Sequence, residues 1–239
     1  MPAKNQNKSV RKAERKAKQK IKQTQTLEKQ DRGSPVDIEL RNDSQKQAWK
    51  LIEQTPITFL LGAAGSGKTF LAMAYAINEI LQKRRTNIIL TRPIVEAGER
   101  LGYLPGTFGD KVNPYMQPLY DTLDILVGKF SPRREVVNKA IVLAPLCYMR
   151  GRSFNDAICI FDEAQNATYG QLKLFLSRFG QNTQAIITGD PLQSDLPISP
   201  APIVEVMHKL ANVPGIATWQ FSSADVVRHP IVAAVLNKL

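Results

Sequence analysis

The stretch GAAGSGKT, residues 62–69, fits the pattern G-x-x-x-x-G-K-[ST] at every position, and its residues are Gly62, Ala63, Ala64, Gly65, Ser66, Gly67, Lys68 and Thr69. An apolar run typical of a strand precedes it (ITFLL, 57–61), and a helix-like segment follows it (TFLAMAYAINEIL, 69–81). A phosphate-binding loop requires this context. Glycines let the backbone wrap around a phosphate, and the helix adds its positive N-terminal end. The alternative, a Gly-rich turn that matches by chance, leaves these flanking segments unexplained.

Two carboxylates stand where such a loop would need them. The apolar run AICIF (157–161) leads directly into Asp162 and Glu163, and ligands of an open parallel sheet bind at the carboxyl ends of its strands. Lys68 would reach the β- and γ-phosphates, while Thr69 and Asp162 would hold Mg²⁺. Glu163 could polarise the water that attacks the γ-phosphate. A pair of residues that caps the next helix is the competing interpretation.

A third apolar run, QAIIT (184–188), ends in GDPLQ (189–193). The amide of Gln193, just beyond the strand, could sense a γ-phosphate by hydrogen bonding. Gly-Asp-Pro is also favourable turn chemistry, and on spacing alone a plain turn is the preferred interpretation.

From about residue 37, short apolar runs alternate with longer amphipathic segments, which predicts an α/β fold with a parallel sheet covered on both faces. The expected strands are 57–61, 87–91, 140–144, 157–161, 184–188 and 216–220. The expected helices are 43–54, 68–83, 114–127, 169–179, 201–211 and 227–238.

The charge of the chain is uneven. Its 239 residues include 32 Lys and Arg against 21 Asp and Glu, a net charge of +11. Residues 1–32 hold 11 of the basic and three of the acidic residues, so +8 lies there and +3 on the rest. We expect a disordered basic tail over 1–36 and one domain over 37–239. The tail could bind nucleic acid, dock on an acidic partner or keep the protein soluble, and its charge favours the first.

Composition also excludes several classes of protein. No apolar run reaches the roughly 18 residues that span a bilayer, and the N-terminus lacks the apolar segment of a secretory signal. Two cysteines and two histidines are too few for the usual four-ligand zinc site. Cys147 and Cys159 are expected to be buried free thiols in a reducing compartment, in preference to a disulfide.

Six motifs together carry a resemblance to a known family. They are GAAGSGKT (62–69), TRPIVEAGERLGYLPG (91–106), KVNPYMQPLYD (111–121), APLCYMRGRSFNDAICIFDEAQN (144–166), TGDPLQSDLP (188–197) and VVRHP (226–230). In this order they resemble the PhoH-like ATPases, named after a phosphate-starvation-inducible bacterial protein. The resemblance implies a three-layer RecA-like P-loop NTPase fold with a mostly parallel sheet, similar to the ATPase half of superfamily 1 helicases. It also implies ATP and Mg²⁺ as cofactors and action on RNA.

The resemblance assigns roles residue by residue. Lys68 and Thr69 match the phosphate lysine and the Mg²⁺ hydroxyl, and Asp162 and Glu163 match the helicase DE pair. The segment that ends at Gln193 matches the helicase GDxxQ motif, which overturns the preference for a plain turn.

Two further matches lie near the ends of the domain. Asn42 and Gln45 resemble the upstream glutamine motif that reads adenine, so Gln45 would favour ATP over GTP. Arg228 resembles the late arginine that serves such ATPases as an arginine finger, within its own chain or across a subunit interface. An ordinary ion pair with Asp225 at a helix start is the alternative.

One RecA-like domain cannot work by closing two lobes, so we expect a homo-oligomer, with a hexameric ring favoured, that couples ATP hydrolysis to binding or remodelling single-stranded RNA or DNA. Candidate nucleic-acid contacts are Arg92, Arg150 and Arg152, at strand ends or in Gly-containing loops, whereas the aromatic residues of the 92–138 segment fit structural roles better. The alternative function is an ATP-controlled assembly module that recruits a nuclease or a ribosome-associated partner. A small-molecule kinase is a third candidate. The expected location is the cytoplasm of a bacterium, or of the bacterial host of a phage.

Overall fold

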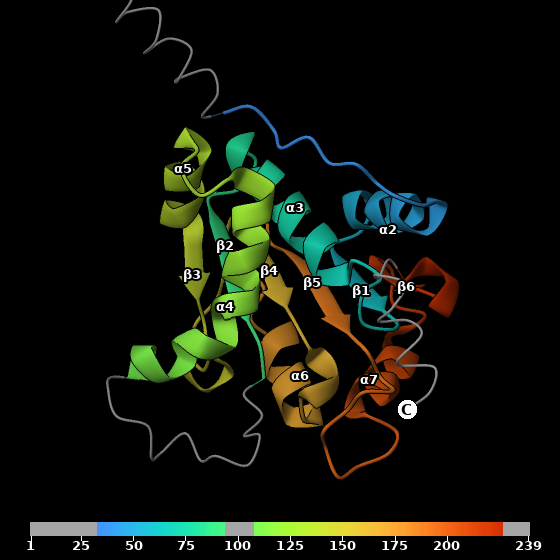
Figure 1. Cartoon of the computed structure of the whole chain (residues 1–239). Coiled ribbons are helices and arrows are strands. Elements are labelled where there is room, and N and C mark those ends of the chain that lie inside the picture. The colour runs from blue at the N-terminus through green and yellow to red at the C-terminus, as the bar shows by residue number, and fades with distance from the viewer. Residues whose placement is uncertain (1–32, 94–107, 227–239) are drawn as a thin grey trace, which may run out of the picture.

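A six-stranded parallel sheet forms the middle layer of the computed structural model, which describes residues 33–93 and 108–226 (Figure 1). Its strands are β1 (Ile57–Leu61), β2 (Asn87–Thr91), β3 (Ile141–Leu143), β4 (Ala157–Phe161), β5 (Gln184–Gly189) and β6 (Ile216–Gln220). They are ordered β3-β2-β4-β5-β1-β6, and every pair is parallel. All carboxyl ends therefore lie at one edge, and β1, β5 and β4, which precede the three motifs, are neighbours there.

Helices cover both faces of this sheet. They are α2 (Asp43–Gln54), α3 (Lys68–Leu81), α4 (Phe108–Val127), α5 (Pro132–Ala140), α6 (Tyr169–Leu176) and α7 (Pro202–Leu210). Short 3₁₀ turns are η2 (Leu146–Tyr148), η3 (Ala164–Asn166) and η4 (Ser223–Asp225).

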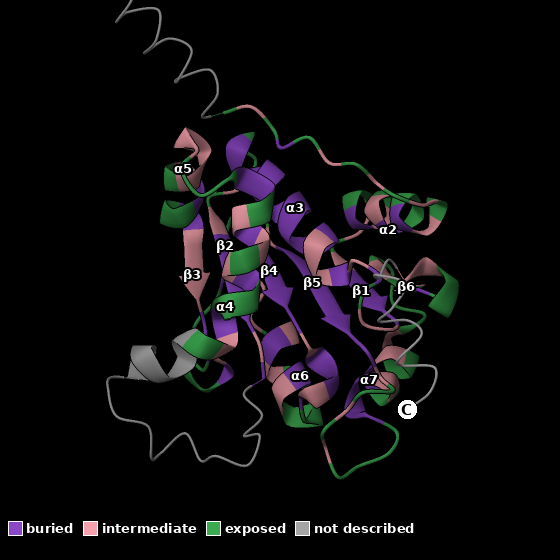
Figure 2. Cartoon of the chain, in the orientation of Figure 1, coloured by how far each residue is buried: buried purple, intermediate pink, exposed green. Residues whose placement is uncertain are grey.

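Alternate residues along a strand pack into two separate hydrophobic cores. On β4, Ile158 and Ile160 pack in the core with α2, α3, α4 and α5, whereas Cys159 and Phe161 pack in the core with α6 and α7. Because β4 is buried on both faces, it reads in the sequence as a continuous apolar run. Helix α3 is buried along nearly its whole length, as Figure 2 shows. These three layers confirm the predicted α/β architecture with a parallel sheet covered on both faces.

Several expected bounds shift by one to three residues, as at α6, which ends at Leu176 instead of residue 179, and the structure departs most from the expected elements in two places. Helix α4 begins at Phe108 instead of residue 114 and carries Pro114 and Pro118 inside it. A proline suggests a helix start because it lacks the N–H that an interior position donates. Helix α5 was not expected at all, although Ser131 caps it and Pro132 opens it. Few of its side chains are buried, so its sequence lacks the apolar period that reveals a helix.

The described helices include none that is both long and apolar enough to cross a bilayer. The basic tail (1–32), the helix expected at 227–238 and Arg228 lie outside the described residues.

Candidate nucleotide-binding and catalytic site

The phosphate loop, residues 62–69, connects β1 to α3 at the carboxyl edge of the sheet. Gly67 has a φ of 90°, and a Cβ there would lie 2.7 Å from Nε2 of Gln45, so only glycine fits this position. Helix α3 begins at the next residue without a side-chain cap. The N–H groups of its first turn are thus left for an anion, which the helix dipole also favours.

The ammonium group of Lys68 lies inside this loop. Its Nζ donates to the carbonyl oxygens of Gly62 at 2.6 Å and Ala63 at 2.9 Å, and the residue is only 9% exposed. A buried positive charge is thereby placed in the middle of a backbone turn, where a phosphate group would compensate it.

Asp162 joins the phosphate loop to two strands. Its Oδ1 accepts hydrogen bonds from the hydroxyls of Thr69 at 2.8 Å and Thr188 at 2.6 Å, and the residue is buried. Thr69 lies in the first turn of α3, Asp162 follows β4, and Thr188 lies in β5. The result is a compact set of oxygen atoms of the kind that Mg²⁺ prefers.

Glu163, one residue further, faces a different environment. Its side chain is 38% exposed, its backbone is left-handed with a φ of 53°, and it makes no capping bond to η3. Instead, Oε1 lies 3.6 Å from a guanidinium nitrogen of Arg92, and Oε2 accepts a 2.6 Å hydrogen bond from Nε2 of Gln165. This carboxylate is therefore held from two sides at the mouth of the site.

The 189–193 segment is both a turn and part of the site. Asp190 accepts backbone N–H groups of Leu192 and Gln193, which is turn geometry. Gln193 also lines a cavity of about 210 Å³ together with the phosphate loop, Asp162, Glu163 and Thr188. We call this space the phosphate cavity.

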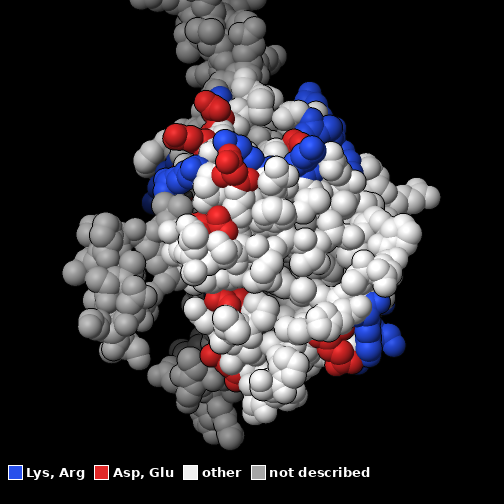
Figure 3. Space-filling view, turned by 90° about the vertical axis from the view of Figure 1, so that its right-hand side faces the viewer, with Lys and Arg blue, Asp and Glu red and all other residues white. Residues whose placement is uncertain are grey.

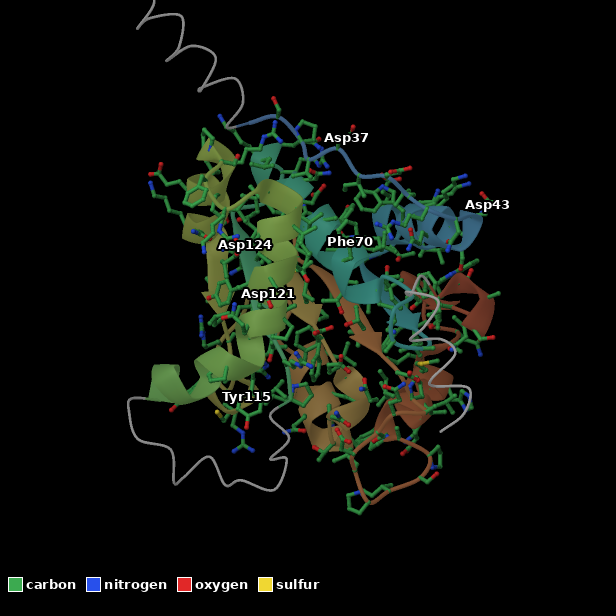
Figure 4. The ribbon with its side chains drawn as sticks, viewed as in Figure 1. Asp37, Asp43, Phe70, Tyr115, Asp121 and Asp124 are labelled. Carbon is green, nitrogen blue, oxygen red and sulfur yellow. The ribbon has the colours of Figure 1, made fainter. Side chains whose placement is uncertain are left out.

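A second cavity, of about 340 Å³, lies on the other side of Gly65 and Gly67. We call it the nucleoside cavity, and its further lining comes from Asp37, Ile38, Glu39, Arg41, Gln45, Phe70 and Ile125. Figure 4 shows Asp37 on the segment that leads into α2 and Phe70 at the start of α3.

Gln45 lies buried at this second cavity with its amide group engaged. Its Nε2 donates to the carbonyl of Ser66 at 3.2 Å, and its Oε1 accepts from the N–H of Arg41 at 2.9 Å. Asn42 caps the helix by accepting the N–H of Gln45. In this arrangement Gln45 fastens α2 to the phosphate loop, and its contact with adenine stays a prediction.

Comparison with known proteins gives matches over most of the chain. The family model described as PhoH-like protein matches residues 37–239. PhoH-like proteins of Mycobacterium leprae and Bacillus subtilis are 44% and 42% identical to the chain, over 81% and 84% of its length.

The chain belongs to the PhoH-like family.

It spans 56% and 63% of the length of those two relatives, that is, less than two thirds of each. Among solved structures, the SWI2/SNF2 ATPase core of Sulfolobus solfataricus in complex with double-stranded DNA is 15% identical. That match has a TM-score of 0.48 and covers 85% of this chain and 52% of the other.

Three residues at this PhoH-like site escaped the sequence analysis: Thr188, Gln165 and Phe70. Thr188 was read as part of an apolar strand, and its hydroxyl becomes significant only because β5 lies beside β4. Gln165 follows the DE pair, and an uncharged amide side chain is not by itself a sign of a catalytic residue. Phe70 looks like any apolar residue of α3. Their positions in the fold, and not their chemical types, bring them to the site.

The remaining predicted residues are spread apart. Arg92 follows β2 and reaches Glu163, as described above. Arg150 and Arg152 are exposed in the loop between η2 and β4, where Arg152 lies over the ring of Phe154 at 5.4 Å. Asp225, the alternative partner of Arg228, accepts hydrogen bonds from the backbone N–H and hydroxyl of Ser222, which lower the pKa of its carboxyl group.

Proposed function

We propose that this PhoH-like chain is a Mg²⁺-dependent ATPase. One observation carries the proposal: the ends of β1, β4 and β5 bring a phosphate loop with a buried lysine, an Asp-hydroxyl cluster and a half-exposed glutamate to a single cavity. A purely structural arrangement would have no use for a buried ammonium group aimed into backbone carbonyls.

The residues divide the work of hydrolysis among them. The N–H groups of the loop and the ammonium of Lys68 bind the β- and γ-phosphates, with phosphate oxygens taking the place of the carbonyls of Gly62 and Ala63. Glu163 accepts a proton from, or orients, the attacking water, and Gln193 contacts the γ-phosphate.

The donor set also fits Mg²⁺. Among the described residues no cluster of three or more His, Cys, Asp or Glu side chains could hold a metal by protein ligands alone. Mg²⁺ typically needs only one or two protein ligands beside substrate phosphates and water, and Thr69 and Asp162 supply them. When bound, the ion would neutralise charge that develops on the phosphate oxygens.

The nucleoside cavity supports ATP as the nucleotide. It opens next to the phosphate loop, so a nucleotide bound by its phosphates would place its base and ribose there. The cavity offers the apolar side chains of Ile38, Phe70 and Ile125 to a base and the carboxylates of Asp37 and Glu39 to ribose hydroxyls. Gln45 would read the adenine edge after exchanging one of its present partners.

We extend the proposal to nucleic acid and assembly. Arg150 and Arg152 would contact single-stranded RNA or DNA, and the basic tail (1–32) would add affinity that falls with salt. On the face in Figure 3, Lys and Arg side chains gather at two ends beside acidic ones, and much of the middle carries neither. By sequence, residues 1–32 carry +8 of the net charge of +11, so the tail is the main source of positive charge. A ring, with six subunits favoured, would let Arg228 complete a neighbour's site.

Glu163→Gln tests the chemistry. It keeps the size of the side chain and removes the base, so we expect ATP hydrolysis to fall by about a hundredfold or more while ATP binding persists. The measurement is the ATPase rate of wild type and variant, each with and without single-stranded RNA. Glu205→Gln, an exposed glutamate on α7, is the matched control.

Each outcome has a clear meaning. RNA-stimulated hydrolysis that Glu163→Gln abolishes supports the coupled ATPase. Hydrolysis that ignores RNA but accompanies a change in oligomer size supports the assembly module instead. A Glu163→Gln variant as fast as wild type contradicts the catalytic role of this carboxylate.

A further inference from the structure

Gln165 occupies an unusual position for an amide side chain. It is 2% exposed and lies in η3, two residues beyond the catalytic glutamate proposed above. Its Nε2 donates a hydrogen bond of 2.6 Å to Oε2 of Glu163. A hydrogen bond to an ionised acceptor is short and strong, and an amide that is itself buried holds it in a fixed direction.

The other end of the same amide holds the 189–193 segment. Oε1 of Gln165 accepts the backbone N–H of Asp190 at 3.0 Å, and Nε2 also lies 3.5 Å from the carbonyl of Gln193. The fit is tight, because a Cβ on Gly189 would lie 2.9 Å from that Oε1. The side chain therefore spans the gap between the carboxylate after β4 and the segment after β5.

We propose that Gln165 is a positioning residue that sets the orientation of Glu163 and couples it to the segment carrying Gln193. The proposal rests on the ATPase function proposed above. If Gln193 contacts the γ-phosphate, its segment moves when a triphosphate binds, and Gln165 transmits that movement to the carboxylate. Arg92, at 3.6 Å and partly exposed, is the looser second partner of Glu163.

A structural role is the competing explanation, since Gln165 could merely anchor the 189–193 segment. The next residue provides the contrast. The side chain of Asn166 also bridges to this region, exchanging hydrogen bonds with Asp195 at 2.9 and 2.8 Å, whereas its only bond to Glu163 in the described structure joins the two backbones at 3.1 Å and not the carboxylate. Asn166→Ala therefore removes an anchor two residues beyond the 189–193 segment without removing a partner of the carboxylate.

The experiment compares Gln165→Ala, Gln165→Glu and Asn166→Ala with wild type in steady-state ATP hydrolysis and in nucleotide binding. Gln165→Glu retains the acceptor for the N–H of Asp190 and, when ionised, replaces the donor to Glu163 by a like charge, so its kcat is measured over a pH range that extends to the ionisation of both carboxylates. We expect both Gln165 variants to lose about ten- to a hundredfold in kcat, because misplacing a catalytic group by about 1 Å costs a factor of that size. KM should stay within about threefold of wild type, as expected when only the transition state is affected. Asn166→Ala should keep its kcat within about twofold.

The outcomes separate this inference from the function beneath it. A wild-type kcat in Gln165→Glu, with or without a slow Gln165→Ala, overturns the positioning role and leaves the ATPase standing. A raised KM at constant kcat also overturns it, because Gln165 would then act in binding. A wild-type chain that hydrolyses no ATP overturns the ATPase and the inference together. If Gln165→Ala does not fold, Gln165→Glu still decides, since it keeps the anchor to Asp190.

Discussion

The two cavities that meet at Gly65 and Gly67 are built in different ways. The phosphate cavity is lined by residues at the ends of three adjacent strands, and its polar atoms are tied to one another: Lys68 to the loop, Asp162 to Thr69 and Thr188. The nucleoside cavity is lined by the segment before α2, the start of α3 and a residue of α4. Sheet topology fixes the first, whereas helix packing assembles the second.

This difference carries a functional lesson. Hydrolysis needs groups placed to within a fraction of an ångström, and a parallel sheet supplies such placement because each strand end is held by its neighbours. Base recognition tolerates a looser frame, and Ile125, on the wall of the nucleoside cavity, is 76% exposed. We therefore expect changes in the phosphate cavity to affect rate, and changes in the nucleoside cavity to affect nucleotide choice.

Among these changes, Lys68→Ala in the phosphate cavity should lower the ATPase rate the most. The change removes a buried side-chain cation that hydrogen-bonds to carbonyls of the phosphate loop, and with it the charge that we propose stabilises the transferring phosphoryl group. We expect the ATPase rate to fall by more than about a hundredfold. Steady-state hydrolysis measures it, with Lys46→Ala as control, since Lys46 is exposed on α2 and pairs with Asp43. An active Lys68→Ala variant would contradict the assignment of the phosphate cavity.

Gln45→Ala should have a smaller and different effect. If the nucleoside cavity reads adenine through this amide, kcat/KM for ATP should fall about tenfold while that for GTP changes little. Measurements of KM and kcat for ATP and for GTP test this prediction. The control is Gln47→Ala, because Gln47 is exposed on the same helix. Equal losses for ATP and GTP would mean that Gln45 acts only by fastening α2 to the loop through Ser66.

What the sequence predicts follows the same division. The strands β1, β2, β4 and β6 have the expected bounds because each is a bounded apolar or β-branched run, and the residues after β1, β4 and β5 converge because parallel strands share one carboxyl edge. The phosphate cavity was therefore foreseen almost whole. Thr188 and Gln165 were not, because their roles depend on which strands are neighbours and on contacts across loops.

Of the residues that line the nucleoside cavity, the sequence predicts Gln45, Gly65 and Gly67. Ile38, Phe70 and Ile125 lie far apart in the chain, and each is an ordinary apolar residue in its own segment. Only the packing of the segment before α2 against α3 and α4 makes them neighbours. No local sequence pattern predicts that packing. Helix α5 is not predicted for a related reason, because few of its side chains are buried and it lacks an apolar period.

Labelling of the two cysteines should have the smallest effect of these tests, and it probes the rigidity of β4 beside the phosphate cavity. Cys159 is buried in β4, three residues before Asp162, and burial raises the pKa of its thiol to about 12. Cys147 is exposed, so the expectation of two buried thiols was wrong for this residue, which lies in the short 3₁₀ turn η2 before β4. The thiolate is the reactive form, so at pH 8 only about one Cys159 in ten thousand would be ionised, and a thiol reagent should label one cysteine in the native chain and two after denaturation. Because the folded state holds this proton more tightly than the unfolded state, stability should fall as the pH rises above about 8.5, the thiol pKa of the unfolded chain.

The variant Cys147→Ser leaves Cys159 as the only thiol, so its slow labelling can be measured alone. Rapid labelling of Cys159 in that folded variant would mean that β4 opens readily, and the rigidity assigned to the phosphate cavity would then have to come from the bound nucleotide instead of the sheet.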